Sequence, residues 1–353
     1  MTATQIIAID AMGGDVGPEV TVPGAALALQ SHAGLSFLLC GDRARIEKEL
    51  QAWPELAQRA QVQHTDTQIA MDAKPSQAMR RGKGTSMWLA LEAVQLGKAT
   101  VAVSAGNTGA LMAVALLLLR PMQGIERPAL AGLWPTTGPQ PCVVLDVGAN
   151  VGASARQLAD FALMGAAMSR AVFARQRPRL GLLNVGTEEV KGVDEVREAH
   201  AILKRIDLGC DYMGFIEGNQ IGHDAADVVV VEGFAGNIAL KTAEGTAKQV
   251  AVYLREAMTS SWPSKLGALL ARGGFDVLRE RMDPRRLNGA TFLGLNGIAI
   301  KSHGGTDALG FASAIGFGYA MARSDIVGRL GRDLAGFHGQ LDAVADASMA
   351  DKT

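Results

Sequence analysis

Short glycine- and asparagine-rich segments follow five apolar runs of this sequence, and these residue types suit the binding of anions. Glycine lets the main chain approach a ligand closely, and N–H groups at the start of a following helix lack partners. Gly and Asn also form ordinary turns and helix caps, but five such segments favour a ligand site. The segments are Met12–Asp15, Gly106–Gly109, Gly148–Asn150, Gly186–Glu189 and Gly233–Asn237.

The apolar runs before these segments are typical of strands that are buried on both faces. They alternate with amphipathic stretches such as Gln157–Arg175, Val193–Ile206 and Ile238–Met258. This alternation predicts an α/β fold, a Rossmann-like αβα sandwich around a mainly parallel sheet. Because the carboxyl ends of parallel strands face one crevice, we expect the five segments to meet there. The expected strands are Ile6–Ala11, Leu35–Cys40, Thr100–Ser104, Ala129–Trp134, Cys142–Val147, Leu180–Val185, Tyr212–Ile216, Val228–Val231 and Gly297–Lys301.

One large α/β domain is expected over residues 1–337, followed by a loose tail of small residues at 338–353. Within the domain, residues 260–286 break the alternation and predict a projecting helical segment. No helical pattern separates Ala129–Trp134 from Cys142–Val147, which favours an antiparallel hairpin at this place.

Composition and charge exclude several classes of protein. Val101–Leu119 has no charged residue, but its Gly and Asn turn indicates a buried strand followed by a buried helix, not a membrane span. The N-terminus lacks the basic segment of a signal peptide, so we expect a cytoplasmic protein. A net charge of −1 argues against a nucleic-acid-binding surface. Cys40, Cys142 and Cys210 have no CxxC spacing and are expected to be buried thiols.

Several common catalytic motifs are absent from the sequence. There is no GxSxG or HExxH motif and no zinc-type Cys/His cluster. Arg81–Ser86 is similar to a phosphate-binding loop, but Gln77 stands where that loop requires its first glycine. Gly316–Gly318 lacks the third glycine of a dinucleotide-binding motif. The chemistry is therefore expected to depend on bound substrates and anion-binding loops.

Six segments carry a resemblance to a known family: Ile9–Asp15, Ser104–Ala110, Asp146–Asn150, Asn184–Gly192, Glu232–Asn237 and Gly294–Gly304. In this order they resemble the PlsX family, the acyl-carrier-protein–phosphate acyltransferases of bacterial phospholipid synthesis. The resemblance implies a fold shared with phosphate acetyltransferases and isocitrate-type dehydrogenases, a homodimer, and no metal or nucleotide cofactor. It also implies transfer of a fatty acyl group from acyl-carrier protein to inorganic phosphate. The resulting acyl phosphate would supply a glycerol-3-phosphate acyltransferase.

In such a reaction phosphate is the nucleophile, so the enzyme positions two substrates and stabilises the oxyanion on the thioester carbonyl. We expect Gly106, Asn107 and Thr108 to cradle phosphate or the oxyanion, because they lie at a turn from strand to helix. Asn150 and Asn237 are loop-end amides that can donate to oxygen without adding charge.

Lysine and histidine side chains near these loops are candidates for the catalytic charges. We expect Lys191 and Lys301 to neutralise phosphate, and His303 to lie on the same side as Lys301 by strand periodicity. A satisfied turn residue is an equally good interpretation of His303. The first segment contributes loop-orienting and capping residues around the substrate: Asp10, Gly13, Gly14 and Asp15.

Two basic clusters are candidates for docking the acidic carrier protein. One lies beside the loops, at Arg80, Arg81 and Lys83, and the other on the helical segment, at Arg279, Arg281, Arg285 and Arg286. That segment is also rich in apolar residues: Trp262, Leu266, Leu269, Leu270 and Phe275. Such a mixture is typical of peripheral contact with the inner face of a membrane. Packing against the second subunit of a dimer is the alternative.

Three other functions compete with this interpretation. A short-chain phosphate acyltransferase that uses coenzyme A differs only in its thioester. A metal- and nucleotide-dependent hydroxyacid dehydrogenase would share the expected fold, but it requires a cluster of aspartates that the sequence does not offer. A non-catalytic anion-binding protein would explain the loops but not the basic residues beside several of them.

Overall fold

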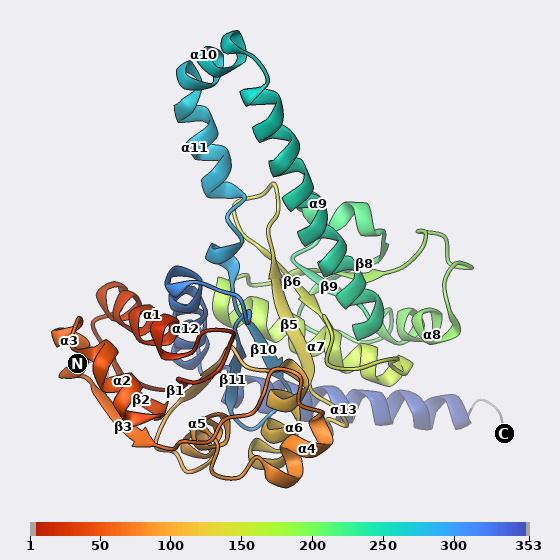
Figure 1. Cartoon of the computed structure of the whole chain (residues 1–353). Coiled ribbons are helices and arrows are strands. Elements are labelled where there is room, and N and C mark those ends of the chain that lie inside the picture. Colours follow the sequence, from red (N-terminus) through yellow and green to blue (C-terminus); the bar gives the residue numbers. More distant parts are fainter. Residues whose placement is uncertain (1–4, 351–353) are drawn as a thin grey trace.

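Eleven strands form a single sheet in the computed structural model, which describes residues 5–350 (Figure 1). They are β1 Gln5–Asp10, β2 Leu35–Gly41, β3 Ala60–His64, β4 Val101–Ser104, β5 Ala129–Trp134, β6 Cys142–Leu145, β7 Arg179–Leu183, β8 Asp211–Ile216, β9 Val228–Val230, β10 Ala290–Leu293 and β11 Ile298–Lys301. Their order in the sheet is β3-β2-β1-β4-β11-β10-β5-β6-β9-β7-β8. The mainly parallel α/β sheet is confirmed, and β3 and β10 are two strands that the sequence did not predict.

Strand direction reverses in the middle of this sheet. β2, β1, β4 and β11 are mutually parallel, whereas β10 is antiparallel to both β11 and β5, and β5 is antiparallel to β6. β6, β9, β7 and β8 are again parallel to one another. The expected hairpin of β5 and β6 is confirmed. The expectation that all five glycine-rich segments share one edge is wrong, because three antiparallel pairings place β6, β9 and β7 in the opposite direction to β1 and β4.

Helices cover both faces of the sheet (Figure 1). They are α1 Pro18–Ser31, α2 Arg43–Leu50, α3 Pro54–Ala57, α4 Pro75–Arg81, α5 Ser86–Gln95, α6 Thr108–Leu119, α7 Ala155–Phe173, α8 Asp194–Leu203, α9 Gly233–Thr259, α10 Trp262–Leu270, α11 Arg272–Arg281, α12 Ala308–Arg323 and α13 Ile326–Ala350, with short 3-10 helices η1 Gly218–His223 and η2 Pro284–Leu287. None of the helices that the structure describes is both long enough and apolar enough to cross a membrane.

The two faces of the sheet are covered unequally. Alternate residues point to opposite faces, so Ile7 and Ile9 of β1 join a core with α1, α7, α12 and α13, whereas Ala8 joins a core with α5 and α6. Over β5, β6 and β9 the elements that pack on this second face are η1 and the first half of α9 (Figure 1). The stretch 101–119, which has no charged residue, forms β4 and α6, as the sequence predicts.

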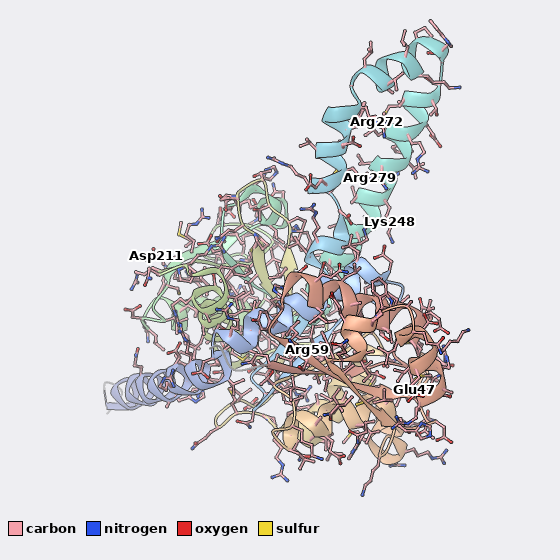
Figure 2. All side chains as sticks on the ribbon, turned by 90° about the vertical axis from the view of Figure 1, so that its left-hand side faces the viewer. Glu47, Arg59, Asp211, Lys248, Arg272 and Arg279 are labelled. Atoms are coloured by element: carbon pink, nitrogen blue, oxygen red, sulfur yellow. The ribbon has the colours of Figure 1, made fainter. Side chains whose placement is uncertain are left out.

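A helical hairpin projects from the sheet (Figures 1 and 2). The predicted projection is present, but it begins in α9 and not at residue 260, so that α9 forms one arm and α10 and α11 return along the other. Only Gly233 and Gly236 are buried among the 27 residues of α9. Its outer part contains many good helix formers and has no proline before Pro263, which explains its length.

The C-terminal segment differs from the loose tail expected at 338–353. Helix α13 continues to Ala350, and residues 351–353 lie outside the described part of the chain. Leu330, Leu334 and Phe337 are buried at helical spacing, and Arg170 of α7 pairs with Asp333 at 2.7 Å. This apolar stripe anchors α13 up to Phe337, and the helix continues past it to Ala350.

Candidate active site

Loops at the carboxyl ends of β1, β4 and β11 form the first of two groups, here called the first loop group. Asp10 is buried there, and its carboxylate accepts a hydrogen bond of 2.6 Å from the Ser104 hydroxyl. The same hydroxyl accepts the N–H of Gly106 at 3.0 Å. Burial raises the pKa of Asp10, while the hydrogen bond from Ser104 and others from Ser86 and the main chain oppose the rise. Asp10 therefore connects the loops that follow β1 and β4.

The N-terminus of α6 lies in the first loop group. Asn107 caps this helix, because its side-chain oxygen accepts the N–H of Ala110 at 2.8 Å. Its amide nitrogen donates to the main-chain oxygen of Met71 at 2.6 Å. Both ends of the amide are thus occupied within the protein. The first main-chain N–H groups of the helix, at Thr108 and Gly109, are the donors that this turn can offer to an anion.

The loop after β11 meets the loop after β1. Gly13 and Gly14 form a turn that brings the N–H of Asp15 to the main-chain oxygen of Gly304 at 3.1 Å. Asp15 itself is exposed. The structure therefore brings together two predicted sets of residues. The substrate-binding residues at the end of β1 lie beside the catalytic residues at the end of β11: Asp10, Gly13, Gly14 and Asp15 in the first set, Lys301 and His303 in the second.

Lys301, at the end of β11, provides a cationic group in this region. Lys301 pairs in register with Ser104, and its ammonium donates to the main-chain oxygens of Ala105 and Ser302. Burial lowers the pKa of Lys301 to about 8, helped by the charge of Lys241 and opposed by Asp10 and Asp15.

His303 is exposed and accepts the N–H of Gly305 on Nδ1 at 3.1 Å, so the neutral ring holds its proton on Nε2. Partial burial and the charge of Lys241 lower the pKa of His303; Glu244 opposes this, and Lys301 and Lys248 lower it further. His303 is therefore a neutral hydrogen-bond donor at ordinary pH.

Loops at the carboxyl ends of β6, β9 and β7 form the second loop group. Asp146 follows β6, is fully buried, and accepts main-chain hydrogen bonds of 2.7–3.0 Å from Leu130, Gly148, Ala149 and Asn150. Burial raises its pKa, while these hydrogen bonds act to lower it. The sequence did not identify this organising role, although an aspartate directly after a buried strand was a signal for it.

Asn150 is buried within the second loop group. Its amide nitrogen donates to Asp146 at 2.8 Å and to the main-chain oxygen of Pro128 at 2.9 Å. The Asn150 amide nitrogen is therefore occupied by internal partners and does not donate to a substrate, contrary to the role predicted for it.

The start of α9 completes the second loop group. The carboxylate of Glu232 caps the helix by accepting the N–H groups of Phe234 at 2.9 Å and Ala235 at 2.6 Å. Gly233 and Gly236 pack directly on the loop after β6, where a Cβ atom would overlap the main-chain oxygens of Asn150 and Asp146. Asn237, one residue further, is exposed.

Lys191 is exposed on the loop that follows β7, the neighbour of β9 in the sheet. Asn184 donates to the main-chain oxygen of Lys191 at 3.1 Å, and Glu189 pairs with Lys204 of α8 at 2.5 Å. These contacts hold the loop on the same edge of the sheet as Asn237.

Helix α9 connects the two loop groups. Asn237 is one turn, or about 6 Å, before Lys241, and Lys241 is close enough to Lys301 and His303 to lower their pKa values. Lys241 also pairs with Glu244 at 2.8 Å. Sequence reasoning missed Lys241, Glu244 and Lys248, because charges at helical spacing are usually an ordinary solvated surface.

The predicted docking and membrane residues lie on two different parts of the molecule. Arg80, Arg81 and Lys83 are exposed at the end of α4, which packs against α6. The projecting hairpin carries the other basic and apolar residues (Figure 2): Arg279, Arg281, Trp262, Leu266, Leu269 and Leu270 are exposed, and Phe275 is half-buried. Unlike the expectation of one basic cluster there, Arg285 pairs with Asp283 and Asp307, and Arg286 pairs with Glu280.

Comparisons with known proteins identify the family of this chain. The family described as fatty acid synthesis protein matches residues 5–329. Proteins named phosphate acyltransferase are similar to this chain: that of Xanthobacter autotrophicus is 57% identical over 337 residues, covering 95% of this chain and 94% of its own length. That of Agrobacterium fabrum is 56% identical over 334 residues, covering 94% of each chain.

Solved structures share the fold at low identity. A phosphotransacetylase from Streptococcus pyogenes has a TM-score of 0.61 at 17% identity, covering 91% of this chain and 94% of that one. A 4-hydroxythreonine-4-phosphate dehydrogenase from Klebsiella pneumoniae has a TM-score of 0.52 at 15% identity, covering 91% and 99%. They confirm the expected relation of the fold to phosphotransacetylases and dehydrogenases. On its sequence, the chain belongs to the fatty acid synthesis protein family, the PlsX family that its motifs resemble.

Proposed function

We propose that this protein transfers a fatty acyl group from the thioester of acyl-carrier protein to inorganic phosphate, which gives an acyl phosphate and the free carrier thiol. Membership of a family whose relatives are named phosphate acyltransferase supports acyl transfer to phosphate. One structural observation carries the proposal: the ammonium of Lys301 contacts Ala105, two residues before the cap of α6, and Lys241 is near enough to Lys301 and His303 to affect both, an arrangement that attracts a small anion.

In the proposed reaction an oxygen of phosphate attacks the thioester carbonyl carbon. A bond forms between phosphate oxygen and carbon, the carbon–sulfur bond breaks, and the electron pair leaves on sulfur. Holding the two substrates together lowers the barrier by roughly 7 kcal/mol or more. Each donor to the oxyanion contributes about 3 kcal/mol.

The residues divide this work between the two loop groups. Lys301, Lys241 and the N-terminus of α6 neutralise phosphate on one side, and Lys191 does so on the other. Asn237 donates to the thioester oxygen, because its amide is exposed at the first turn of α9. Lys301 also protonates the leaving thiolate, since its pKa of about 8 is close to that of an ordinary thiol.

Two surfaces are proposed for the partners. Arg80, Arg81 and Lys83 dock the acidic carrier protein beside the first loop group, because α4 packs on the helix that begins there. The tip of the projecting hairpin contacts an anionic membrane, where the acyl phosphate passes to glycerol-3-phosphate acylation. The protein is proposed to act as a homodimer.

The test is incubation of the protein with palmitoyl acyl-carrier protein and phosphate, with acyl phosphate detected by mass spectrometry and the free carrier thiol by titration. We expect both products in equal amounts, and neither without phosphate. Palmitoyl and acetyl coenzyme A serve as comparison donors. Faster transfer from acetyl coenzyme A would replace the proposal with the short-chain alternative, and absence of acyl phosphate with every donor would refute it.

A further inference from the structure

One side of helix α8 holds the loop that carries Lys191. Arg197 donates to two main-chain oxygens of this loop at 3.3 Å, and Lys204 pairs with the carboxylate of Glu189. His200 lies between them, because spacings of three and four residues place Arg197, His200 and Lys204 in one row along the helix. The row therefore faces the loop with a histidine at its centre.

Two aromatic side chains of β8 fix the ring of His200. The ring stacks on Phe215 with centroids 4.3 Å apart, and its Nδ1 forms a hydrogen bond of 2.7 Å with the Tyr212 hydroxyl. Only 12% of the His200 side chain is exposed. The ring therefore has one orientation, in which Nε2 lies 3.9 Å from the carboxylate of Glu189.

A β-bulge brings both aromatic side chains to His200. One extra residue, Met213, interrupts the pairing of β8 with β7. Residues three positions apart point to opposite faces of a regular strand, yet Tyr212 and Phe215 both contact His200. Gly214 completes the bulge with a φ of 84°, a left-handed conformation that favours glycine. Bulges of this kind re-aim side chains and are frequent beside active sites.

The second ring nitrogen of His200, Nε2, is buried beside the loop. Among the residues that the structure describes, no group forms a hydrogen bond with it. Burial raises the pKa of Tyr212, so the hydroxyl keeps its proton and can donate it to Nδ1. The proton of the neutral ring is then on Nε2, where it faces the negative charge of Glu189.

We propose that His200 is a positioning residue for Lys191. Its Nε2–H attracts the carboxylate of Glu189 and so holds the loop in which Lys191, two residues further, reaches phosphate. A shift of Glu189 by roughly 1 Å brings its carboxylate within hydrogen-bond distance of Nε2. The inference rests on the proposed function, in which Lys191 neutralises phosphate.

His200 is a more rigid anchor for Glu189 than Lys204 is. The side chains of Lys204 and Glu189 are 51% and 74% exposed, and such an ion pair contributes little because water and side-chain entropy oppose it. His200 is held in place by Phe215 and by the Tyr212 hydroxyl. Burial and the charge of Lys204 lower the pKa of His200, against the effect of Glu189, so the ring is an uncharged donor at neutral pH.

The test uses two amides that each replace one nitrogen of the imidazole ring. The glutamine amide reaches the position of Nε2, and the asparagine amide reaches that of Nδ1. His200→Asn should therefore raise KM for phosphate about fivefold and change kcat less than about twofold. His200→Gln should keep both values within about twofold of the wild type. Equal effects of the two substitutions on KM would overturn the proposal.

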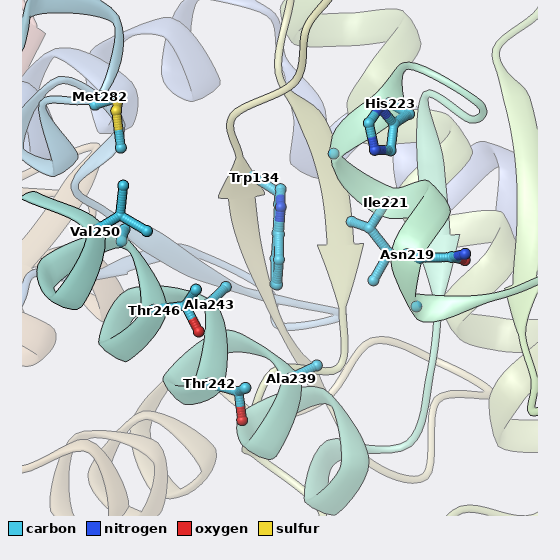
Figure 3. A pocket seen from close by; sticks show the side chains of 13 residues that line it. Trp134, Asn219, Ile221, His223, Ala239, Thr242, Ala243, Thr246, Val250 and Met282 are labelled. Atoms are coloured by element: carbon cyan, nitrogen blue, oxygen red, sulfur yellow. The ribbon is translucent and has the colours of Figure 1, made fainter. Parts of the chain in front are cut away.

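His223→Asn is the matched control and should change neither value. His223 lines a groove beside α9 (Figure 3). Its neighbour Gly222 accepts the N–H of Thr137 at 2.9 Å, in the turn before β6, so this histidine lies toward the opposite edge of the sheet from the Lys191 loop.

A double substitution tests whether His200 acts through Lys191. In a Lys191→Met background, His200→Asn should change KM for phosphate less than about 1.5-fold, because the side chain that it positions is already absent. The full fivefold effect in this background would mean that His200 acts on the whole fold and not on Lys191.

A measurement without turnover covers the case in which His200→Asn fails to fold. In ¹⁵N NMR spectra of histidine-labelled wild-type protein at neutral pH, we expect the ring proton of His200 on Nε2, with a resonance that shifts in Glu189→Ala. A proton on Nδ1, or a resonance that Glu189→Ala leaves unchanged, would overturn the proposal. If the wild type makes no acyl phosphate, the proposed function fails, and these spectra alone decide whether His200 holds Glu189.

Discussion

The two loop groups are built on the same device but leave different groups free. In each, a buried aspartate at the end of a strand fixes the following loop: Asp10 through the Ser104 hydroxyl, and Asp146 through four main-chain N–H groups and the Asn150 amide. The first group retains a cationic cluster around Lys301, whereas the second retains exposed side chains, Lys191 and Asn237. The aspartates thus give rigidity, and the reactive groups come from the residues around them.

The largest expected effect is on the close packing of the second loop group. Gly236→Ala places a methyl group against the main-chain oxygen of Asp146, which cannot move away without breaking the loop. We expect a loss of about 3 kcal/mol in the free energy of unfolding, measured by urea denaturation. Gly245→Ala is the matched control on the same helix, because nothing lies near its Cβ position. It should stabilise the protein by about 0.5–1 kcal/mol; equal effects of both substitutions would contradict this packing.

The next prediction compares the lysine of the first loop group, Lys301, with the lysine of the second, Lys191. Lys301→Met should lower kcat/KM for phosphate about 100-fold, and Lys191→Met about tenfold, with unchanged melting temperatures. Lys301 loses its charge as pH rises through its pKa of about 8, so wild-type activity should fall above that pH. Lys301→Arg keeps its charge and should move this fall to higher pH. A pH profile that is the same in wild type and Lys301→Arg would remove Lys301 from the catalytic residues.

A smaller effect distinguishes two asparagines that look equivalent in the sequence. Asn107 holds the cap of α6 and the loop at Met71, whereas the amide of Asn237 is exposed. Asn107→Ala should therefore cost about 1 kcal/mol of stability as well as activity. Asn237→Ala should reduce turnover about tenfold at unchanged stability. Denaturation curves and steady-state rates of the two variants decide, and the reverse pattern would exchange their roles.

The strands of the sheet show how far the sequence predicts the structure. Buried strands were found because each is a short apolar run bounded by glycine. β3 was missed because Ala60–His64 is a partly exposed edge strand with two glutamines, and β10 because its four residues follow a long helical hairpin. The reversal of strand direction depends on β10, which pairs with its sequence neighbour β11 on one side and, across more than 100 residues of sequence, with β5 on the other. No local pattern contains that information.

The same limit applies to the candidate site. The glycine-rich segments identify where loops leave the sheet, because only small residues allow those turns. Whether an amide such as that of Asn150 faces a ligand or an internal carboxylate depends on partners distant in the fold. Lys241 became a candidate only because α9 passes beside Lys301, a proximity that spans 60 residues of chain.

The hairpin tip should affect lipid binding and not the chemistry of the loop groups. Leu269→Glu with Leu270→Glu should abolish co-sedimentation with vesicles that contain anionic phospholipid, because it puts charge into the most exposed apolar pair of the tip. Ala251→Glu with Val252→Glu adds the same charge to the shaft of α9 and should leave lipid binding unchanged. Loss of a dimer in the tip variant, or no lipid binding of the wild type, would instead assign this surface to the second subunit.

Removal of divalent metal should leave the rate of acyl transfer unchanged, the smallest effect expected. In either loop group a metal would need carboxylates that are free to coordinate it. Asp146 is saturated by N–H donors, and Asp10 accepts from Ser104 beside the ammonium of Lys301, whose charge opposes a cation. Among the residues whose side chains the structure describes, no group of three or more His, Cys, Asp and Glu is placed to hold a metal ion. Turnover of palmitoyl acyl-carrier protein should therefore be the same with and without EDTA. A rate that falls with EDTA and returns with magnesium or manganese would mean that the loop groups hold a metal, as a dehydrogenase of this fold would require, and that phosphate is not neutralised by lysine alone.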